Sequence, residues 1–309
     1  MTADSMKSPL IDMAAPAPEL NEALTAACTD WGFFQVLHHG IDAHLLQAAL
    51  DASRTFFALP LADKQALSRS EDQPWGYYDR ELTKNLRDRK EIFDFGHTGP
   101  VPWPAAAPEF KAVSRQFSAA AHALGLKLSV RIAEAFGLPT APVRRLDEQH
   151  GSFTRLNHYP LQDPLAHSDA PPPGPLGISQ HTDAGVITVL LQDSVSGLQM
   201  QRDGSWIDVT PRPGTLTVNV GDMFQVWSND RIAAPVHRVL ASERAERYSI
   251  AYFLNPGEDS VIEPLLPAHN GQQARYEPIH WAEFRGLRAL GDYANYGEEV
   301  QISHYRRQG

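Results

Sequence analysis

The stretch SFTRLNHY at residues 152–159 decides the fold, because the periodicity of the chain changes there. Successive side chains of an extended strand point to opposite faces, so Phe153, Arg155, Asn157 and Tyr159 share one face and His158 lies on the other. Before this stretch, apolar residues recur every three or four positions, which is typical of helices. After it, the period is two. We therefore predict that a region of β-structure begins here.

Working outward, the second half of the chain contains many short apolar runs separated by Asp-Gly, Pro-Gly and Gly-Asp turns. Further strands are predicted at residues 185–192, 197–201, 206–209, 215–220 and 247–254. Many short strands at close spacing favour a closed antiparallel sandwich over a parallel sheet. The fold class that we predict is mainly β with flanking helices.

The first half and the C-terminal end are predicted to be largely helical. A helical pattern covers residues 19–67, interrupted by a buried strand at 32–37, and a long amphipathic helix covers about 110–136. Residues 75–78 are predicted to form a loop, and helix returns from Ile279. We divide the chain into an N-terminal helical and mixed region, a long helix with its connector, a β core and a C-terminal helical extension, at residues 1–108, 109–149, 150–256 and 257–309.

Composition excludes several classes of protein. The chain has 309 residues, 42% of them hydrophobic, enough for a sizeable core. A net charge of −10 with dispersed basic residues argues against nucleic-acid binding. The single cysteine, Cys28, cannot form an internal disulfide and suits a reducing compartment. With no signal-peptide pattern and no run long enough to cross a bilayer, we expect a soluble cytoplasmic protein without membrane contact.

The pattern His181-Thr182-Asp183, followed much later by His237, predicts a metal centre. Two imidazoles and one carboxylate are the ligand set of the facial triad, which leaves coordination positions of Fe(II) open for other ligands. Residues two apart on a strand face the same way, so His181 and Asp183 can aim at one point. His237 must then come from a different strand. Zinc would bind the same atoms, so the residues alone do not identify the metal.

A second candidate site follows ten residues after His237. Arg247 and Ser249 lie on the same face of the predicted strand at 247–254. A guanidinium presents a fork of donors that binds a carboxylate through two charge-assisted hydrogen bonds, and a hydroxyl can add another donor. The pair is therefore suited to hold the far carboxylate of a dicarboxylic cosubstrate.

These residues belong to a series of short motifs that extends along nearly the whole chain. In order they are Trp31-Gly32-Phe33-Phe34, Lys90-Glu91, Phe93-Asp94-Phe95, Asn157-His158-Tyr159-Pro160, His181-Thr182-Asp183, Gly221-Asp222, Gln225-Val226-Trp227-Ser228-Asn229, His237-Arg238-Val239, Arg247-Tyr248-Ser249 and Phe253-Leu254-Asn255-Pro256. Each motif is weak alone, but their order and spacing are specific. The chain resembles the isopenicillin-N-synthase-like branch of the iron(II)- and 2-oxoglutarate-dependent oxygenases.

The resemblance implies a double-stranded β-helix, a distorted jelly roll, with Fe(II) held inside one open end. It implies 2-oxoglutarate and O2 as cosubstrates, decarboxylation to succinate and CO2, and oxidation of a small molecule, by default hydroxylation. Tyr159 and Asn157 are expected near 2-oxoglutarate. The residues expected to form substrate-pocket walls are Tyr77, Tyr78, Phe93 and Phe253. No protein partner is implied.

Three alternatives remain open at this point. The nearest is an iron oxidase of the isopenicillin-N-synthase type that uses no 2-oxoglutarate, in which Arg247 and Ser249 would hold a carboxylate of the substrate instead. A zinc hydrolase could use the same ligands to activate water, although no general base is evident beside them. A binding module or sensor without activity is the third. Formation of succinate would distinguish the first from the main hypothesis.

Overall fold

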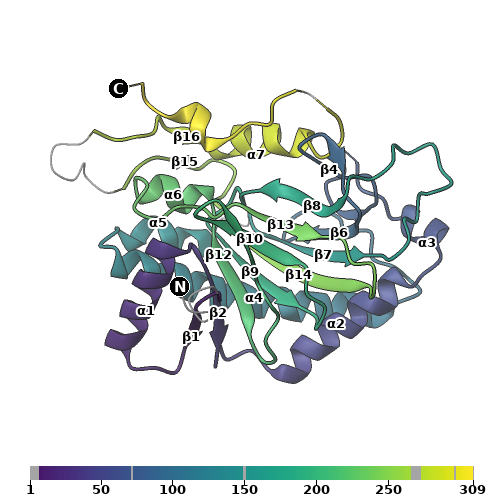
Figure 1. The fold of residues 1–309 in the computed structure, drawn as a ribbon, viewed down its shortest axis with the longest axis horizontal. Coiled ribbons are helices and arrows are strands. Elements are labelled where there is room, and N and C mark those ends of the chain that lie inside the picture. The colour runs from purple at the N-terminus through teal and green to yellow at the C-terminus, as the bar shows by residue number, and fades with distance from the viewer. Residues whose placement is uncertain (1–6, 71, 149–150, 266–272, 296, 309) are drawn as a thin grey trace.

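The computed structural model describes residues 7–70, 72–148, 151–265, 273–295 and 297–308. In this part of the chain two β-sheets face each other, and long helices pack on the outer side of the larger sheet (Figure 1). The predicted boundary between residues 149 and 150 lies outside the described residues.

The larger sheet has eight strands among the described residues. Their order across the sheet is β1 (Leu10–Asp12), β2 (Phe33–Leu37), β12 (Leu216–Val220), β9 (Ile187–Gln192), β14 (Arg247–Leu254), β7 (Phe153–Tyr159), β6 (Glu91–Gly96) and β3 (Gly76–Tyr78). Only β1 and β2 pair in parallel, and the other neighbours are antiparallel. The strand that begins at Arg247 therefore lies in the middle of the sheet, beside the strand that ends at Tyr159.

The smaller sheet closes the sandwich. Its order is β11 (Ser205–Asp208), β10 (Leu198–Arg202), β13 (His237–Leu240) and β8 (Leu176–His181), all antiparallel. Phe33 and Tyr159 of the larger sheet pack against Leu198, Met200 and Val239 of the smaller one in a single buried cluster. The two sheets thus form the predicted jelly-roll core. Two short hairpins lie outside it, β4 (Leu82–Thr83) with β5 (Leu86–Arg87), and β15 (Val261–Ile262) with β16 (Ile279–His280).

The helices surround this core. They are α1 (Ala17–Asp30), α2 (Ala43–Phe57), α3 (Leu61–Gln65), α4 (Pro108–Ala135), α5 (Thr140–Arg144), α6 (Asp222–Trp227) and α7 (Trp281–Leu290), with 3-10 turns at Arg145–Asp147 and Ile302–Tyr305. The long helix α4 starts with a proline in its first turn and ends shortly before Gly137, which has the left-handed φ of +69°.

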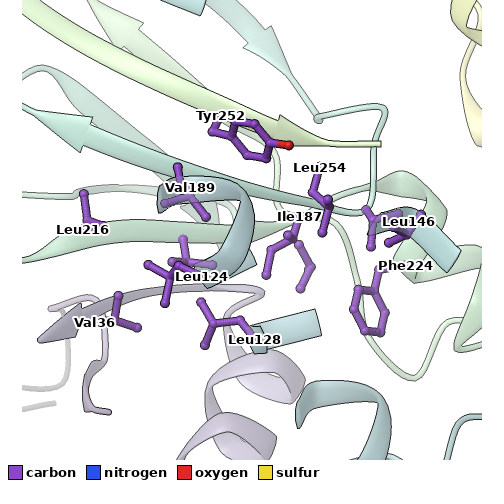
Figure 2. Packing of buried hydrophobic residues seen from close by; sticks show 14 of the residues in the cluster. Val36, Leu124, Leu128, Leu146, Ile187, Val189, Leu216, Phe224, Tyr252 and Leu254 are labelled. Atoms are coloured by element: carbon purple, nitrogen blue, oxygen red, sulfur yellow. The ribbon is translucent and has the colours of Figure 1, made fainter. Parts of the chain in front are cut away.

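The main core lies between α4 and the outer face of the larger sheet. Leu124 and Leu128 of α4 pack against Ile187 and Val189 of β9 (Figure 2). All four side chains are at most 3% exposed, and burying a leucine fully contributes about 1.5–3 kcal/mol. One face of the sheet is therefore occupied by helix packing, which leaves the inner face, between the two sheets, for a binding site.

Most of the predicted elements agree with the structure, but one predicted loop is a strand and several strands were not predicted. Residues 75–78 were predicted as a loop, but Gly76–Tyr78 forms strand β3, paired with β6. Strands β8 and β13 are absent from the predicted set, because their residues are mixed in polarity and β13 spans only four residues. A two-residue period is not visible in such segments. Among the described residues, no helix is both long and apolar enough to cross a membrane.

Candidate functional site

The three predicted metal ligands lie together at one end of the sandwich. His181 is the last residue of β8, and His237 is the first residue of β13 and its cross-strand partner. Asp183 lies in the loop two residues after His181 rather than on the strand itself. Its Oδ1 is 3.7 Å from Nε2 of His181 and 3.6 Å from Nε2 of His237. One candidate ligand atom from each residue lies within 4.8 Å of the other two.

Backbone carbonyls orient both imidazoles. Nδ1 of His181 donates to the carbonyl of Ser179 at 2.8 Å, and Nδ1 of His237 donates to the carbonyl of Pro235 at 3.1 Å. A carbonyl only accepts, so Nδ1 must carry the hydrogen, and the neutral ring keeps its lone pair on Nε2. In each ring Nε2 is the atom that faces Asp183. The imidazoles are therefore held in the tautomer that can bind a cation between them.

Hydrogen bonds from two other strands position Asp183. Its Oδ2 accepts hydrogen bonds from Thr188 Oγ1 at 2.5 Å and from Asn219 Nδ2 at 2.8 Å, which leaves Oδ1 for the histidines. Its own carbonyl accepts from the backbone N–H of Asp222 at 2.8 Å. A Cβ on Gly221 would lie 3.0 Å from the Asp183 carbonyl oxygen and closer still to the neighbouring loop. Only glycine allows this close approach of the two loops.

The electrostatics of the triad suit a divalent metal. Burial and the neighbouring His237 lower the pKa of His181 to about 3, so its ring is neutral at neutral pH. Burial opposes ionisation of Asp183, but the two imidazoles and the hydrogen bonds from Asn219 and Thr188 outweigh it and lower the pKa of Asp183. Two imidazole nitrogens and one carboxylate, with oriented hydrogen-bond partners behind them, form the donor set that binds Fe(II) in a facial triad. The residues present therefore fit an iron ion.

The triad lines a cavity between the two sheets. The cavity encloses about 1110 Å³ when its open mouth is counted. Strands β7 and β14 contribute every second residue to its wall, so that Asn157, Tyr159, Arg247 and Ser249 all line it. His158 is not among its lining residues, as the alternation predicts, and its Nδ1 contacts Glu91 instead.

Arg247 is the most unusual group of this wall. It is only 1% exposed, and its guanidinium donates to Gln192 Oε1 at 2.9 Å and contacts Ser249 Oγ at 3.5 Å. The Tyr159 ring lies 4.8 Å from its Cζ. In the part of the chain that the structure describes, no carboxylate pairs with it and no acceptor reaches its Nε. A buried cation without a counter-ion, facing a cavity, is suited to bind an anion there.

The four aromatic residues predicted as pocket walls divide into two groups. Phe253 lines the cavity, stacked on Phe153 with ring centroids 4.7 Å apart. Tyr77, Tyr78 and Phe93 do not line it. Phe93 faces the helices, 4.9 Å from the ring of Phe56, and the Tyr77 hydroxyl donates to a buried glutamate. Tyr78 packs against the ring of Tyr293, 5.2 Å away. The structure does not bring these three to the cavity. The expectation came from the layout of the similar family, whereas packing against Phe56 and Tyr293 decides their positions here.

Several residues of the site were missed. Thr188 and Asn219 hold Asp183, and Gln192 holds Arg247. Asn219 left a signal, since it is the polar residue in the otherwise apolar end of β12. Arg285 and Arg288 also line the cavity, from α7. Nothing in their local sequence marks them, because they reach the site only through the docking of the C-terminal helix.

Comparisons with known proteins agree with this geometry. The model of the 2OG-Fe(II) oxygenase superfamily matches residues 150–256, and that of the non-haem dioxygenase in morphine synthesis N-terminal region matches residues 8–116. The chain is 35% identical to gibberellin 20 oxidase 2 of Oryza sativa subsp. indica over 277 residues, which is 84% of this chain and 68% of the relative.

Two solved structures share the fold. A full-length Neurospora crassa protein in complex with alpha-KG superposes with a TM-score of 0.80 at 28% identity, covering 95% of this chain and 98% of that one. JOX2 in complex with 2OG, Fe and JA superposes with a TM-score of 0.83 at 27% identity, covering 100% of this chain and 93% of the other.

Proposed function

The chain belongs to the 2OG-Fe(II) oxygenase superfamily, and from that premise we propose which of its residues carry the chemistry. It is a 2-oxoglutarate-dependent dioxygenase, which couples oxidative decarboxylation of 2-oxoglutarate to oxidation of a second small molecule. Its cofactor is Fe(II), and its cosubstrates are 2-oxoglutarate and O2. The assignment of residues to roles is our proposal.

We propose that Nε2 of His181, Nε2 of His237 and Oδ1 of Asp183 bind the iron. When bound, Fe(II) supplies the redox chemistry that activates O2. The protein supplies position: the carbonyls of Ser179 and Pro235 fix the ring nitrogens that face the centre. Thr188 and Asn219 keep the carboxylate ionised and turned toward the imidazoles. Asp183 and His237 are buried and His181 is partly exposed, which limits the access of bulk water to the triad.

Arg247 binds the distal carboxylate of 2-oxoglutarate in this proposal, with Ser249 as an additional donor. The observation that carries it is the burial of Arg247, without a counter-ion among the described residues, in the cavity that the triad also lines. The strand register supports roles for Tyr159 and Asn157 at the same site, because Arg247 pairs with Tyr159 and Ser249 pairs with Asn157 across β14 and β7. Tyr159 therefore packs against the guanidinium, and the Asn157 carboxamide lies beside Ser249, where both can contact the cosubstrate.

The alternative, an iron oxidase that needs no 2-oxoglutarate, has less support. The two solved structures named above were both determined with this cosubstrate bound. In a 2-oxoglutarate-dependent enzyme the cosubstrate supplies the carboxylate that binds Arg247, so no carboxylate of the primary substrate is needed there. Hydroxylation of a small molecule is the outcome that we propose by default. A cytoplasmic location is proposed on the buried, free thiol of Cys28, which suits a reducing compartment.

Anaerobic titration tests the assignment. Metal-free protein is titrated with Fe(II) and then with 2-oxoglutarate, and visible absorption reports the metal-to-ligand charge-transfer band of the chelated cosubstrate. We expect the band in the wild-type protein and a large loss of 2-oxoglutarate affinity in Arg247→Ala, with Fe(II) affinity retained. Arg244→Ala, in the exposed turn before β14, is the matched control. Binding of Fe(II) without any band would favour the oxidase, and no Fe(II) binding would refute the triad.

A further inference from the structure

Helix α7 places two arginines at the cavity, Arg285 and Arg288. The residues Trp281, Phe284 and Arg288 are the buried residues of the helix, at the spacing of one helical face. Arg285 is adjacent to Phe284 on this face and lines the cavity. Glu283, on the same helix, is exposed. The side chain of Arg285 is thus partly exposed, and it reaches the cavity and the ring of Phe153.

The other cations around this part of the cavity are all paired. Arg155 donates to Asp94 through Nε and Nη2, both at 2.8 Å, and to Glu81 at 2.7 Å. Lys90 contacts Glu81 at 2.9 Å and Asp88 at 3.1 Å. Of these carboxylates Glu81 lines the cavity itself, and Asp88 and Asp94 do not. The cations and carboxylates together form a fixed, satisfied network with no donor that needs a further anion.

Arg285 differs from them. Among the described residues it makes no hydrogen bond to a side chain or carbonyl and no ion pair, and its Cζ lies 5.6 Å from the ring centroid of Phe153. Burial and the charge of Arg155 lower the pKa of Arg285, against the attraction of Asp292. Asp292 itself is directed to Arg69, at 3.4 Å. A guanidinium stays charged at any physiological pH, so Arg285 presents five N–H donors and a positive charge to the cavity.

The register of β7 and β14 shows where this cation lies relative to the cosubstrate. Arg247 pairs with Tyr159 at one end of the paired strands, and Phe253 pairs with Phe153 at the other. Six residues of strand separate these two ends, a distance of about 20 Å. Arg285 lies over Phe153, at the far end from Arg247. Among the described residues, the cavity therefore has one unpaired cation toward each end of this strand pair, and the metal-binding triad lines it from β8, β13 and the loop after β8 in the smaller sheet.

We propose that Arg285 binds a carboxylate of the primary substrate, and that this substrate is a small organic acid whose apolar body packs against Phe253. The inference rests on the proposed function, because it assigns the Arg247 end to 2-oxoglutarate and leaves the other end for the second molecule. The cation of Arg285 and the apolar surface beside it would hold such an acid by one end and direct its remaining carbon skeleton into the cavity that the triad lines. The competing explanation is that Arg285 only covers the ring of Phe153 through a cation–π contact.

Matched acids and amides distinguish these explanations. The protein is loaded anaerobically with Fe(II) and saturating 2-oxoglutarate, so that Arg247 is occupied, and the binding of 3-phenylpropanoate, cyclohexylacetate and their primary amides is measured by calorimetry. We expect each acid to bind more tightly than its amide. Arg285→Gln should weaken acid binding by about 10- to 100-fold, the strength of a charge-assisted hydrogen bond, and leave amide binding unchanged. Arg285→Lys should retain part of the preference, and Glu283→Gln, which removes an exposed charge from the same helix, should retain all of it.

The outcomes test the carboxylate site at Arg285 separately from the proposed function. If the amides bind as tightly as the acids, if no acid binds, or if Arg285→Gln weakens acid and amide equally, Arg285 is not a carboxylate site and the inference is wrong. The proposed function is tested separately in the loading step. If the wild-type protein does not bind 2-oxoglutarate, the proposed function fails first and this inference fails with it. Normal 2-oxoglutarate binding without a preference for acids refutes the inference alone.

Discussion

Removing the Thr188 hydroxyl should weaken metal binding without disturbing the fold. Thr188→Val replaces a hydroxyl by a methyl group of similar size and deletes the 2.5 Å hydrogen bond to Oδ2 of Asp183. Asn219 then remains as the single side-chain donor to that oxygen. Hydrogen bonds to charged groups contribute about 1.5–3 kcal/mol, and the outer partners of metal ligands typically account for about 10- to 100-fold in metal affinity. The two ranges agree, since each 1.4 kcal/mol corresponds to about tenfold.

The expected result is a fall in metal affinity of at least about tenfold, because the carboxylate is no longer held in its binding orientation. Co(II), whose visible absorption reports coordination by imidazole and carboxylate, serves as the titrant at constant pH. Thr154→Val is the matched control, since Thr154 is buried in the same sheet but its hydroxyl donates to Ser118 of α4, on the opposite face. The control should lose about 0.5–1.5 kcal/mol of stability and no metal affinity.

The reasoning would be refuted by equal Co(II) affinities in the wild-type protein and Thr188→Val. In that case the orientation of Asp183 would not depend on its hydrogen bonds. Loss of Co(II) affinity in both threonine variants would instead point to general loosening of the sheet. Urea denaturation of the metal-free proteins separates the two cases, because a local effect leaves the free energy of unfolding within the range of the control.

Two further variants test the buried ion pairs that hold the site in place. Arg288 donates to the carbonyl of Thr182, between His181 and Asp183, at 2.8 Å, and it is the counter-ion 3.6 Å from buried Asp222. Arg288→Met removes both contacts, so urea denaturation should show that the free energy of unfolding falls by about 3–5 kcal/mol. Lys64→Met leaves the buried carboxylate of Glu91 without its 2.6 Å ion pair and should cost a similar amount. Burial opposes ionisation of Glu91, but hydrogen bonds from His158 and Lys64 lower its pKa below the ordinary 4.5. The ionised Glu91 therefore stabilises the fold above pH 4.5, and this stabilisation is lost as the pH falls through its lowered pKa. In an acid titration, Lys64→Met should unfold at a higher pH than the wild-type protein. An unchanged midpoint would contradict this.

Much of the fold was predictable from the sequence because strands carry a local signal. The alternation at residues 152–159 places Asn157 and Tyr159 on one face and His158 on the other, and the structure has them so. The same rule puts Arg247 and Ser249 side by side on the cavity wall. Order and spacing of short motifs identified the family, since such a series is specific where each motif alone is not.

Where the signal was ambiguous, packing decided. The alternation in β6 does not tell whether Phe93 faces the cavity or the helices. Phe93 lies in the core because Phe56 of α2 and Phe110 of α4 pack against its ring. The partners of Asp183 come from β9 and β12, and nothing in the sequence pairs Thr188 or Asn219 with that carboxylate. Such contacts depend on which strands become neighbours, and a single periodicity does not encode that.

The sequence by itself thus determined the class of fold, the three metal-binding candidates and the arginine-serine pair, because each depends on spacing along one or two strands. The tertiary structure decided the rest. It brought His237 to His181 across a strand pair and buried Arg247 with no counter-ion in the part of the chain that the structure describes. It also docked α7 so that Arg285 reaches the far end of the cavity. The physical reason is that burial and electrostatic pairing are properties of groups that meet only after the chain has folded, whereas periodicity is already present in the unfolded chain.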